Sequence, residues 1–147
     1  MLLGEGLESI GYYCFGDNNL SKVVIPSTVT YISDGAFESC IHMKQVSFAG
    51  EVLEVIGSEA FARSGLEYFI APASLHELRD SAFMGCENLK YVNLGTCTLR
   101  SDNEENYLSD NIFCGSALET IVLPRTLRVI GKSAFEDCKC LKSVSFG

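Results

Sequence analysis

Cysteine and histidine side chains are the first candidates for chemistry in this sequence, and their spacing argues against most of it. The chain has seven cysteines and two histidines, with no Cys-x-x-Cys pair. His42 and His76 stand in no metal-ligand spacing, whereas zinc needs four ligands around one point. A catalytic thiol at Cys114 or Cys138 would need a histidine base, and neither histidine belongs to their repeats. We therefore predict no metal site and no cofactor.

Other catalytic signatures are also missing from the sequence. It contains no Gly-x-Ser-x-Gly elbow, no phosphate-binding loop and no His-Glu-x-x-His motif. The carboxylates of Asp102, Glu104, Glu105 and Asp110 supply oxygen atoms that could ligate calcium, but they lack the EF-hand spacing and a turn glycine. We expect a solvated acidic loop at this point, and we predict that the chain is not an enzyme.

An internal repeat positions all of these residues. Six phenylalanines each follow an aliphatic residue by five positions, and three further apolar residues recur at fixed distances after each phenylalanine. The unit is I-G-x-x-A-F-x-x-C-x-x-L-x-x-V-x-I-P. The steps between anchors are 22, 24, 22, 30 and 22 residues. The anchors are Phe15, Phe37, Phe61, Phe83, Phe113 and Phe135.

The repeats alternate in pairs. Odd repeats place a leucine five residues after the phenylalanine and end their strand with proline. Even repeats place the next apolar residue six positions after it and end their strand with alanine or glycine. The step of 30 residues is six longer than the step of 24. We assign the extra residues to a loop insertion within residues 96–107.

Such a unit cannot bury its apolar positions alone, but stacked copies bury them continuously. We therefore predict a leucine-rich-repeat solenoid of about six repeats of 22–24 residues, forming one domain over residues 1–147. The alternating segment L-x-x-V-x-I predicts parallel strands on one face. The segment with the phenylalanine predicts turns, short 3-10 segments or strand segments on the other face.

Three cysteines, Cys40, Cys86 and Cys138, lie three positions after a phenylalanine, in even repeats only. Two rungs of a solenoid are about 10 Å apart, whereas a disulfide needs Cα atoms within about 7 Å. We therefore expect buried free thiols that pack as small apolar groups. Cys97, in the insertion, and Cys140, near the last strand, are the thiols that we expect to be most exposed.

The repeat resembles the BspA-like leucine-rich repeat (LRR) family, found on bacterial and protozoan surfaces. The matching segments are I-G-S-E-A-F (Ile56–Phe61), A-F-E-S-C (Ala36–Cys40), L-K-Y-V-N-L (Leu89–Leu94) and V-V-I-P-S-T-V-T-Y-I (Val23–Ile32). The resemblance covers about residues 7–146. It implies a cell-surface or secreted adhesion or interaction module, and it supplies no catalytic residue.

The strand positions between the inward residues must point outward, and they form two columns that we call the outward strand face. We predict a partner-binding surface centred on Tyr68 and Tyr91, because tyrosines offer contact area and hydroxyl groups at low entropic cost. An ordinary solvated sheet face is the alternative. The predicted contact residues are Gln45, Tyr68, Ile70, Tyr91 and Asn93. The two columns are Lys22, Gln45, Tyr68, Tyr91, Thr120, Ser143 and Val24, Ser47, Ile70, Asn93, Val122, Ser145.

Two functions compete at this stage. The first is a non-enzymatic protein-protein interaction or adhesion module that binds a host or matrix protein, or a glycan. The second is a structural repeat spacer within a larger surface protein. A binder should cluster aromatic or apolar residues on its outward positions, whereas a spacer should carry interchangeable polar ones. Tyr68, Ile70 and Tyr91 favour the binder.

The net charge and the terminal residues limit which partners and which cellular location we expect. The formal charge of −8 argues against nucleic acid and against an anionic membrane, and no apolar run is long enough to span a bilayer. The N-terminal residues lack the pattern of a signal peptide, which stands against the surface location that the family resemblance implies. The sixth strand ends at Phe146 and Gly147. Two explanations are open: the chain is a fragment of a longer array, which we favour, or two chains pair end to end. In both cases we expect this open edge to favour end-to-end self-association.

Overall fold

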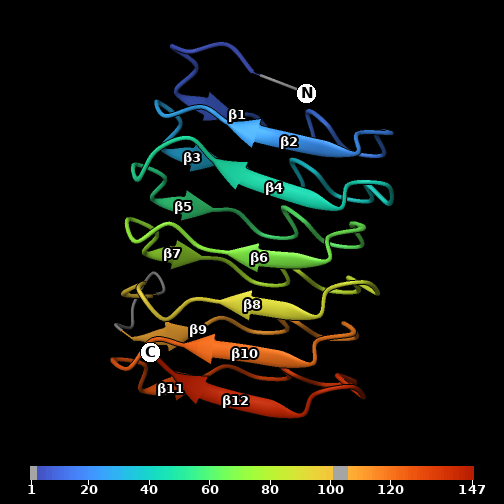
Figure 1. The fold of residues 1–147 in the computed structure, drawn as a ribbon, viewed down its shortest axis with the longest axis vertical. Coiled ribbons are helices and arrows are strands. Elements are labelled where there is room, and N and C mark those ends of the chain that lie inside the picture. Colours follow the sequence, from blue (N-terminus) through green and yellow to red (C-terminus); the bar gives the residue numbers. More distant parts are fainter. Residues whose placement is uncertain (1–2, 101–105) are drawn as a thin grey trace.

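A computed structural model describes residues 3–100 and 106–147. Each turn of the chain, which we call a rung, contains one longer strand, one two-residue strand and a turn around the anchor phenylalanine. The rungs stack in chain order, and the two termini lie at opposite ends of the stack (Figure 1). The longer strands are β2 (Lys22–Ile25), β4 (Gln45–Phe48), β6 (Tyr68–Ile70), β8 (Tyr91–Asn93), β10 (Thr120–Leu123) and β12 (Ser143–Phe146).

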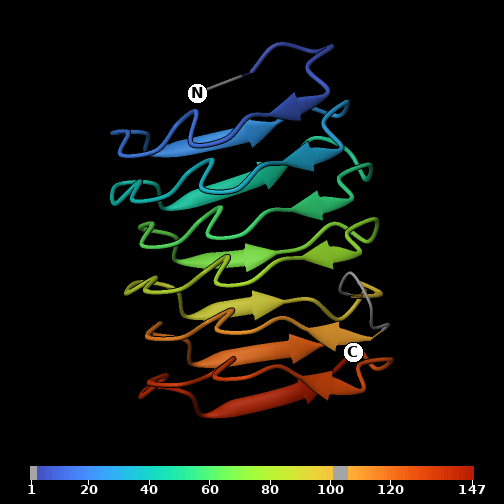
Figure 2. The same cartoon turned by 180° about the vertical axis from the view of Figure 1, so that it is seen from behind.

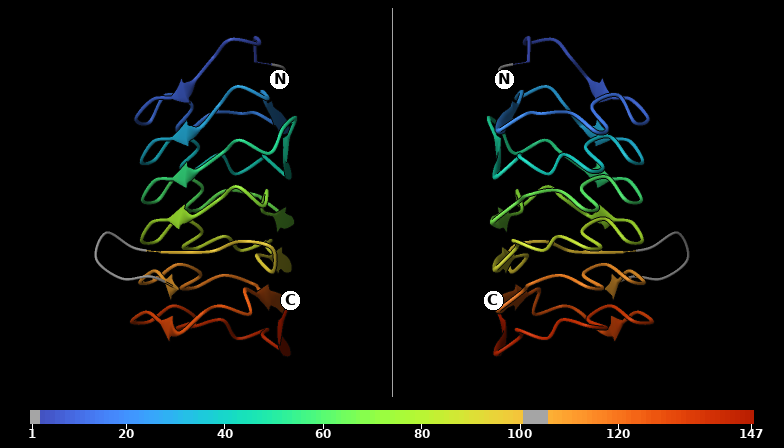
Figure 3. Two further views of the ribbon diagram at one scale, coloured as in Figure 1. Left: turned by 90° about the vertical axis from the view of Figure 1, so that its left-hand side faces the viewer. Right: turned by 90° about the vertical axis from the view of Figure 1, so that its right-hand side faces the viewer.

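The two-residue strands form a second line on the opposite side of the stack (Figures 2 and 3). They are β1 (Ser9–Ile10), β3 (Tyr31–Ile32), β5 (Val55–Ile56), β7 (Glu77–Leu78), β9 (Tyr107–Leu108) and β11 (Val129–Ile130). Every strand pair in the described residues is parallel, and equivalent residues of neighbouring repeats are in register. This parallel-strand solenoid of about six turns confirms the predicted fold.

The line of longer strands is interrupted once. Strands β6, β8, β10 and β12 form one sheet, and β2 and β4 form another. The backbone of β4 is joined to the next rung just outside the strands, where Glu67 N donates to Lys44 O at 3.2 Å. The interruption therefore lies between β4 and β6.

The phenylalanines stack through the centre of the solenoid. Ring centroids of successive anchors are 5.3–5.6 Å apart, and the rings lie nearly parallel. The four inner anchors, Phe37, Phe61, Phe83 and Phe113, are fully buried, while Phe15 and Phe135 at the two ends are partly buried. One column of identical side chains thus forms the centre of a continuous core.

The turn around each phenylalanine has a fixed backbone pattern. The residues two before and two after every anchor have positive φ, as Glu59 (54°) and Arg63 (55°) do around Phe61. Between them the phenylalanine N–H donates to a carbonyl of the next rung, for example from Phe61 N to Ala82 O at 2.9 Å. Three of these twelve positive-φ positions are occupied by glycine, which adopts this conformation without strain: Gly35, Gly85 and Gly115.

The cysteines of the repeat consensus are hydrogen-bonded parts of the core. The thiol of Cys40 donates to Phe15 O at 2.9 Å, and the thiols of Cys86 and Cys138 make the same bond to Phe61 O and Phe113 O at 3.1 Å. All seven cysteines are free. Cys40 and Cys86 are buried as predicted, whereas Cys138, nearer the end of the stack, is only partly buried.

The prediction for Cys97 was wrong, whereas Cys140 is exposed as predicted. Cys97 is only 3% exposed, and its N–H donates to Leu94 O as Leu75 N does to Pro72 O one rung earlier. Residues at this corner point inward in each repeat, so Cys97 takes the place of a core aliphatic residue. The 30-residue spacing between Phe83 and Phe113 shows that residues are inserted, but it does not show where within residues 96–107 the insertion begins.

The chain follows the repeat up to Arg100, which forms a parallel bridge to Glu77. It returns at Tyr107–Leu108, which pair with β11. Among the acidic residues predicted for a solvated loop, Asp102, Glu104 and Glu105 lie outside the described residues. Asp110 lies beyond them, where its Oδ1 accepts hydrogen bonds from Tyr107 Oη (2.6 Å) and Lys132 N (2.8 Å).

Candidate functional site

The outward strand face has the geometry that the repeat predicts. Tyr68 and Tyr91 are register partners on neighbouring strands, and Ile70 is the partner of Asn93. The residue between them on β6, Phe69, is fully buried. Tyr68 is 36% exposed and Ile70 is 55% exposed, while Gln45, Tyr91 and Asn93 are half-buried. The two tyrosines therefore lie side by side on one surface.

A groove of about 230 Å³ crosses this surface at the interruption between β4 and β6. Gln45, Tyr68 and Ile70 line it, so the structure brings three of the five predicted residues around one hollow. Tyr91 and Asn93 belong to the next strand and extend the surface beyond the groove. Without the interruption, hydrogen-bonded strands would leave less space here, since paired strands lie only about 4.8 Å apart.

Six of the nine residues that line the groove are not among the predicted contact residues, and Phe48 and Glu51 are two of them. Phe48 stands at the strand position of the repeat unit that alternation turns inward, but it is only partly buried and lines the groove. Glu51 lies in the corner after β4, and its Oε2 accepts the Ala73 N–H at 2.7 Å. The corner between Phe48 and Ile56 is one residue longer than that between Ile25 and Ile32. That extra length was the signal that could have identified Glu51.

Hydrogen bonds hold part of the surface in place. The Asn93 side chain accepts the Gly95 N–H at 2.9 Å, which fixes its amide oxygen at the end of β8. Below the groove, the Phe69 ring packs against Phe48 and Phe83 with centroids 5.9 and 4.7 Å away. These packed rings hold the strands below the exposed side chains in place. Little conformational entropy would therefore be lost when a partner binds this surface.

The candidate chemical residues do not assemble. Within the described part of the chain, no group of three or more histidine, cysteine or acidic side chains could hold a metal ion. His76 Nε2 lies 3.8 Å from Glu54 Oε2. Burial raises the pKa of Cys86 to about 11 and that of Cys97 to about 12. Both are therefore protonated and poor nucleophiles at neutral pH.

The family model described as the BspA type leucine rich repeat region matches residues 8–138 and 106–147, in six copies. The chain belongs to the BspA-type leucine-rich repeat family. This confirms the resemblance carried by the phenylalanine-anchored unit. No curated protein matches the sequence. Proteins of this fold are generally interaction scaffolds, because stacked repeats present extended surfaces.

Solved structures of surface and antigen proteins share the fold. The pneumococcal vaccine antigen PcpA is 26% identical, with a TM-score of 0.73 over 94% of this chain and 35% of that one. The Treponema protein TpLRR of T. pallidum is 28% identical, with a TM-score of 0.70 over 84% of this chain and 57% of that one. A leucine rich cell surface protein from Faecalibacterium prausnitzii is 24% identical, with a TM-score of 0.60 over 94% and 42%.

This chain thus spans 35% to 57% of the length of these three proteins. The last of them shares the fold alone at its level of identity. No helix long and apolar enough to cross a bilayer occurs in residues 3–100 and 106–147.

Proposed function

We propose that this BspA-type repeat protein is a non-enzymatic module that binds another protein through its outward strand face, in an adhesion role. The observation that carries the proposal is the pair Tyr68 and Ile70 at the groove between β4 and β6, with Tyr91 beside Tyr68 on the next strand. Large amphipathic side chains on a rigid base are typical of binding hot spots. The contact surface extends to Gln45 and Asn93.

No other position of the two columns is aromatic, which supports a localised site. Beyond Tyr91 the first column continues with Thr120 and Ser143, which are its register partners along the sheet. Aromatic side chains on two adjacent rungs together supply the contact area that a binding hot spot uses. The charge of −8 favours partners with a basic surface, whose association would weaken as salt is added.

We infer a cell-surface or secreted location from the same family. BspA-like proteins are found on cell surfaces, and one similar structure is that of a leucine rich cell surface protein. A host or matrix protein is the partner that fits this location, and a glycan is the other candidate. Selective labelling of intact cells with a membrane-impermeant reagent tests the location, and labelling only after lysis would contradict it.

A structural spacer is the second candidate, because repeats of this kind also set length within larger proteins. The polar residues of the outward columns, such as Ser47, Thr120 and Ser143, are the observation that favours this alternative. The two functions differ in what the tyrosines do. In a spacer, replacing the two tyrosines has no effect on the binding of any partner.

The test compares binding of the wild type, a site variant and a matched control. The probes are immobilised extracellular-matrix proteins, whole cells and a glycan array. We expect Tyr68→Ala/Tyr91→Ala to raise the Kd for the partner found by roughly thirtyfold or more, as hot-spot residues do. The control is Thr120→Ala/Ser143→Ala, in the same column, which should bind as the wild type does.

Circular dichroism and urea unfolding establish that each variant is folded. Equal affinity of the two double variants would contradict the proposed surface. Failure of the folded wild type to bind any probe would contradict the interaction role and favour the spacer.

We also propose that two copies of this 147-residue chain associate end to end through β12. This strand has β10 as its neighbour, and its inward residues Val144 and Phe146 are 46% and 55% exposed. An unpaired parallel edge with exposed apolar side chains is a template for another strand. Sedimentation velocity should show a concentration-dependent dimer that Val144→Lys abolishes. A monomer at every concentration would contradict this proposal.

A further inference from the structure

The groove between β4 and β6 has a single charged side chain in its lining. This is Glu51, an exposed residue in the corner that follows β4. The other lining residues carry no formal charge, and they are Gln45, Val46, Ser47, Phe48, Tyr68, Ile70, Ala71 and Pro72. The groove therefore presents one negative charge within an otherwise neutral surface.

Apolar side chains lead along the groove toward this carboxylate. Gln45 and Tyr68 begin strands β4 and β6, so the polar groups lie at the start of the groove. Ile70, which is 55% exposed, ends β6, and Phe48 ends β4. Pro72 follows in the corner after β6. The surface before the carboxylate is thus aliphatic and aromatic.

A hydrogen bond holds the Glu51 carboxylate at the groove. Its Oε2 accepts the Ala73 N–H at 2.7 Å, from the corner of the next rung. The two oxygens of a carboxylate together offer about four acceptor positions, so this bond leaves the group able to accept others. A carboxylate that is already positioned loses little freedom when it pairs with a ligand.

No basic group within the protein balances this charge. The ion pairs of residues 3–100 and 106–147 do not include Glu51. Lys44, just before β4, has its Nζ 3.3 Å from Glu67 Oε1, at the opposite end of the strand from Glu51. A cation that pairs with Glu51 must therefore come from outside the chain.

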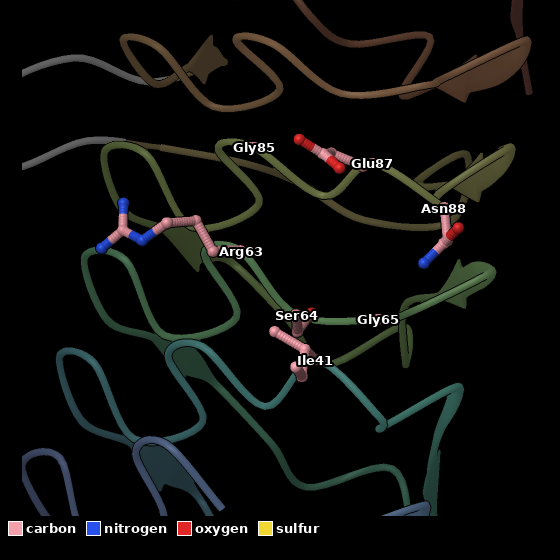
Figure 4. A pocket seen from close by; sticks show the side chains of 7 residues that line it. All are labelled: Ile41, Arg63, Ser64, Gly65, Gly85, Glu87 and Asn88. Carbon is pink, nitrogen blue, oxygen red and sulfur yellow. The ribbon is translucent and has the colours of Figure 1, made fainter.

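Two cavities on the turn side of the solenoid lack this one-sided charge. The first, of about 270 Å³, is lined by both Arg63 and Glu87 (Figure 4). The second, of about 390 Å³, is lined by Asp137 and Lys139, whose charged groups are 3.7 Å apart. Linings with charges of both signs favour neither a cation nor an anion. Of these three hollows, the groove is the one with a clear preference for a cation.

The size of the groove fits one long side chain. Its volume of about 230 Å³ lies below the roughly 300–1,000 Å³ of typical small-molecule sites. Lysine and arginine have an aliphatic stem that packs on apolar surface and a charged head that pairs with a carboxylate. Phe48 and Tyr68 add aromatic rings, and cations are attracted to the faces of such rings.

We propose that the groove binds a lysine or arginine side chain of the partner protein, with its stem on Ile70 and Phe48 and its cationic head at Glu51. The inference rests on the proposed binding role of the outward strand face and names the chemistry that this face selects. Tyr68 and Tyr91 then supply contact area around this anchor. Because the ion pair stays in contact with water, added salt should weaken it.

Other side chains fit the groove less well. An aliphatic side chain would cover part of the Glu51 carboxylate without pairing it, and removing an unpaired charge from water is costly. An acidic side chain would be repelled by the same carboxylate. A basic side chain alone satisfies both the apolar lining and the charge.

NMR titration of the isotope-labelled protein with three blocked tripeptides tests the proposal. The peptides are acetyl-Ala-Arg-Ala-amide, acetyl-Ala-Lys-Ala-amide and acetyl-Ala-citrulline-Ala-amide, in which citrulline has the shape of arginine without its charge. At least one basic peptide should bind roughly tenfold more tightly than the citrulline peptide, with shifted signals at Glu51 and Ile70. The stronger of the two basic peptides identifies the preferred head group.

Three variants separate the charge from the apolar contact. Glu51→Gln should abolish the preference for the basic peptide, while its amide oxygen can still accept the Ala73 N–H. The matched control is Glu54→Gln, which removes the same charge from an exposed residue outside the groove lining and should keep the preference. Ile70→Ala should weaken the basic and citrulline peptides alike, because it removes the surface on which the stem lies.

Three results would overturn the proposal. They are equal affinities of the basic and citrulline peptides, the absence of binding by both basic peptides, and an equal loss of preference in Glu51→Gln and Glu54→Gln. A partner from the binding screen that needs Tyr68 and Tyr91, but binds Glu51→Gln as it binds the wild type, would leave the proposed function standing and overturn this inference. Glu51-dependent binding of a basic peptide without any macromolecular partner would support the inference and contradict the adhesion role.

Discussion

The interior and the outward strand face of this solenoid use the repeat in opposite ways. Inside, the same side chain recurs at the same place in every rung, as the six stacked phenylalanines show. Outside, equivalent positions differ from one rung to the next. The column that contains Tyr68 and Tyr91 begins with lysine and ends with serine.

The difference teaches how to separate structure from function in a repeat protein. A residue that recurs meets the same neighbours in each rung, so packing explains its identity. An outward residue that departs from its column is not needed for stacking, so its identity calls for another explanation. Four predictions test or sharpen this comparison, and they are ordered by the size of the expected effect.

Shortening an inner phenylalanine should have the largest effect. Phe83 stacks between Phe61 and Phe113 and is fully buried. We expect Phe83→Ala to lower the free energy of unfolding by about 3–5 kcal/mol, through lost burial and an unfilled cavity. Urea unfolding measures this. The control is Phe146→Ala, because Phe146 is 55% exposed and its loss should cost less than about 1 kcal/mol. Similar losses in both variants would contradict the stacked core.

Replacing the glycine that follows a two-residue strand should change stability by an intermediate amount that depends on the rung. A Cβ on Gly57 would come within 2.5 Å of the Asp34 backbone nitrogen, whereas a Cβ on Gly11, at the same place in the first rung, has nothing within 4 Å. Gly57→Ala should therefore destabilise the protein by about 1–3 kcal/mol. Gly11→Ala should leave stability within about 1 kcal/mol, toward stabilisation. Thermal unfolding compares the two, and an equal response would contradict the close stacking of the rungs.

Thiol reactivity should divide the cysteines into interior and surface groups. Burial raises the pKa of Cys86 to about 11 and that of Cys97 to about 12, while Cys14 and Cys140 are exposed. At mildly alkaline pH we expect iodoacetamide to modify Cys86 and Cys97 roughly a hundredfold more slowly than Cys140. Peptide mass spectrometry follows each site, and urea should remove the difference. Equal rates for Cys97 and Cys140 in the native protein would place Cys97 on the surface.

Replacing Asp110, whose carboxylate accepts a backbone N–H of the next rung, should have the smallest effect. Hydrogen bonds from Tyr107 and the Lys132 N–H lower the pKa of Asp110, so the carboxylate stabilises the fold above the pKa of the unfolded chain. That contribution is lost as the pH falls through the lowered pKa. Asp110→Asn should therefore lose less stability than the wild type on acidification.

Thermal unfolding across the acid range measures this difference. Asp34 accepts the Ser58 N–H at 2.8 Å, as Asp110 accepts that of Lys132. Asp34→Asn is therefore the matched variant for Asp110→Asn, because it replaces a carboxylate that accepts the same kind of backbone hydrogen bond in another rung. Parallel curves for the wild type and Asp110→Asn would show that the carboxylate charge does not contribute.

Periodicity made the fold predictable, because apolar columns that recur every rung must be buried by stacking. It also fixed which side of each strand faces outward, so Tyr68 and Tyr91 could be placed beside each other. The groove could not be predicted, because the break between β4 and β6 depends on strand pairing and not on any column. Cys97 was misplaced for a related reason, since a change in repeat length does not show where the chain leaves its rung.

The central claim is that the unrepeated residues of the outward strand face bind the partner. Chemical-shift mapping by NMR, with labelled wild-type protein and the partner found in the binding screen, tests it most directly. We predict perturbed signals clustered on Gln45, Tyr68, Ile70, Tyr91 and Asn93, with β10 and β12 unchanged. Perturbations spread evenly along all six rungs, or confined to the two-residue strands on the opposite side, would contradict it.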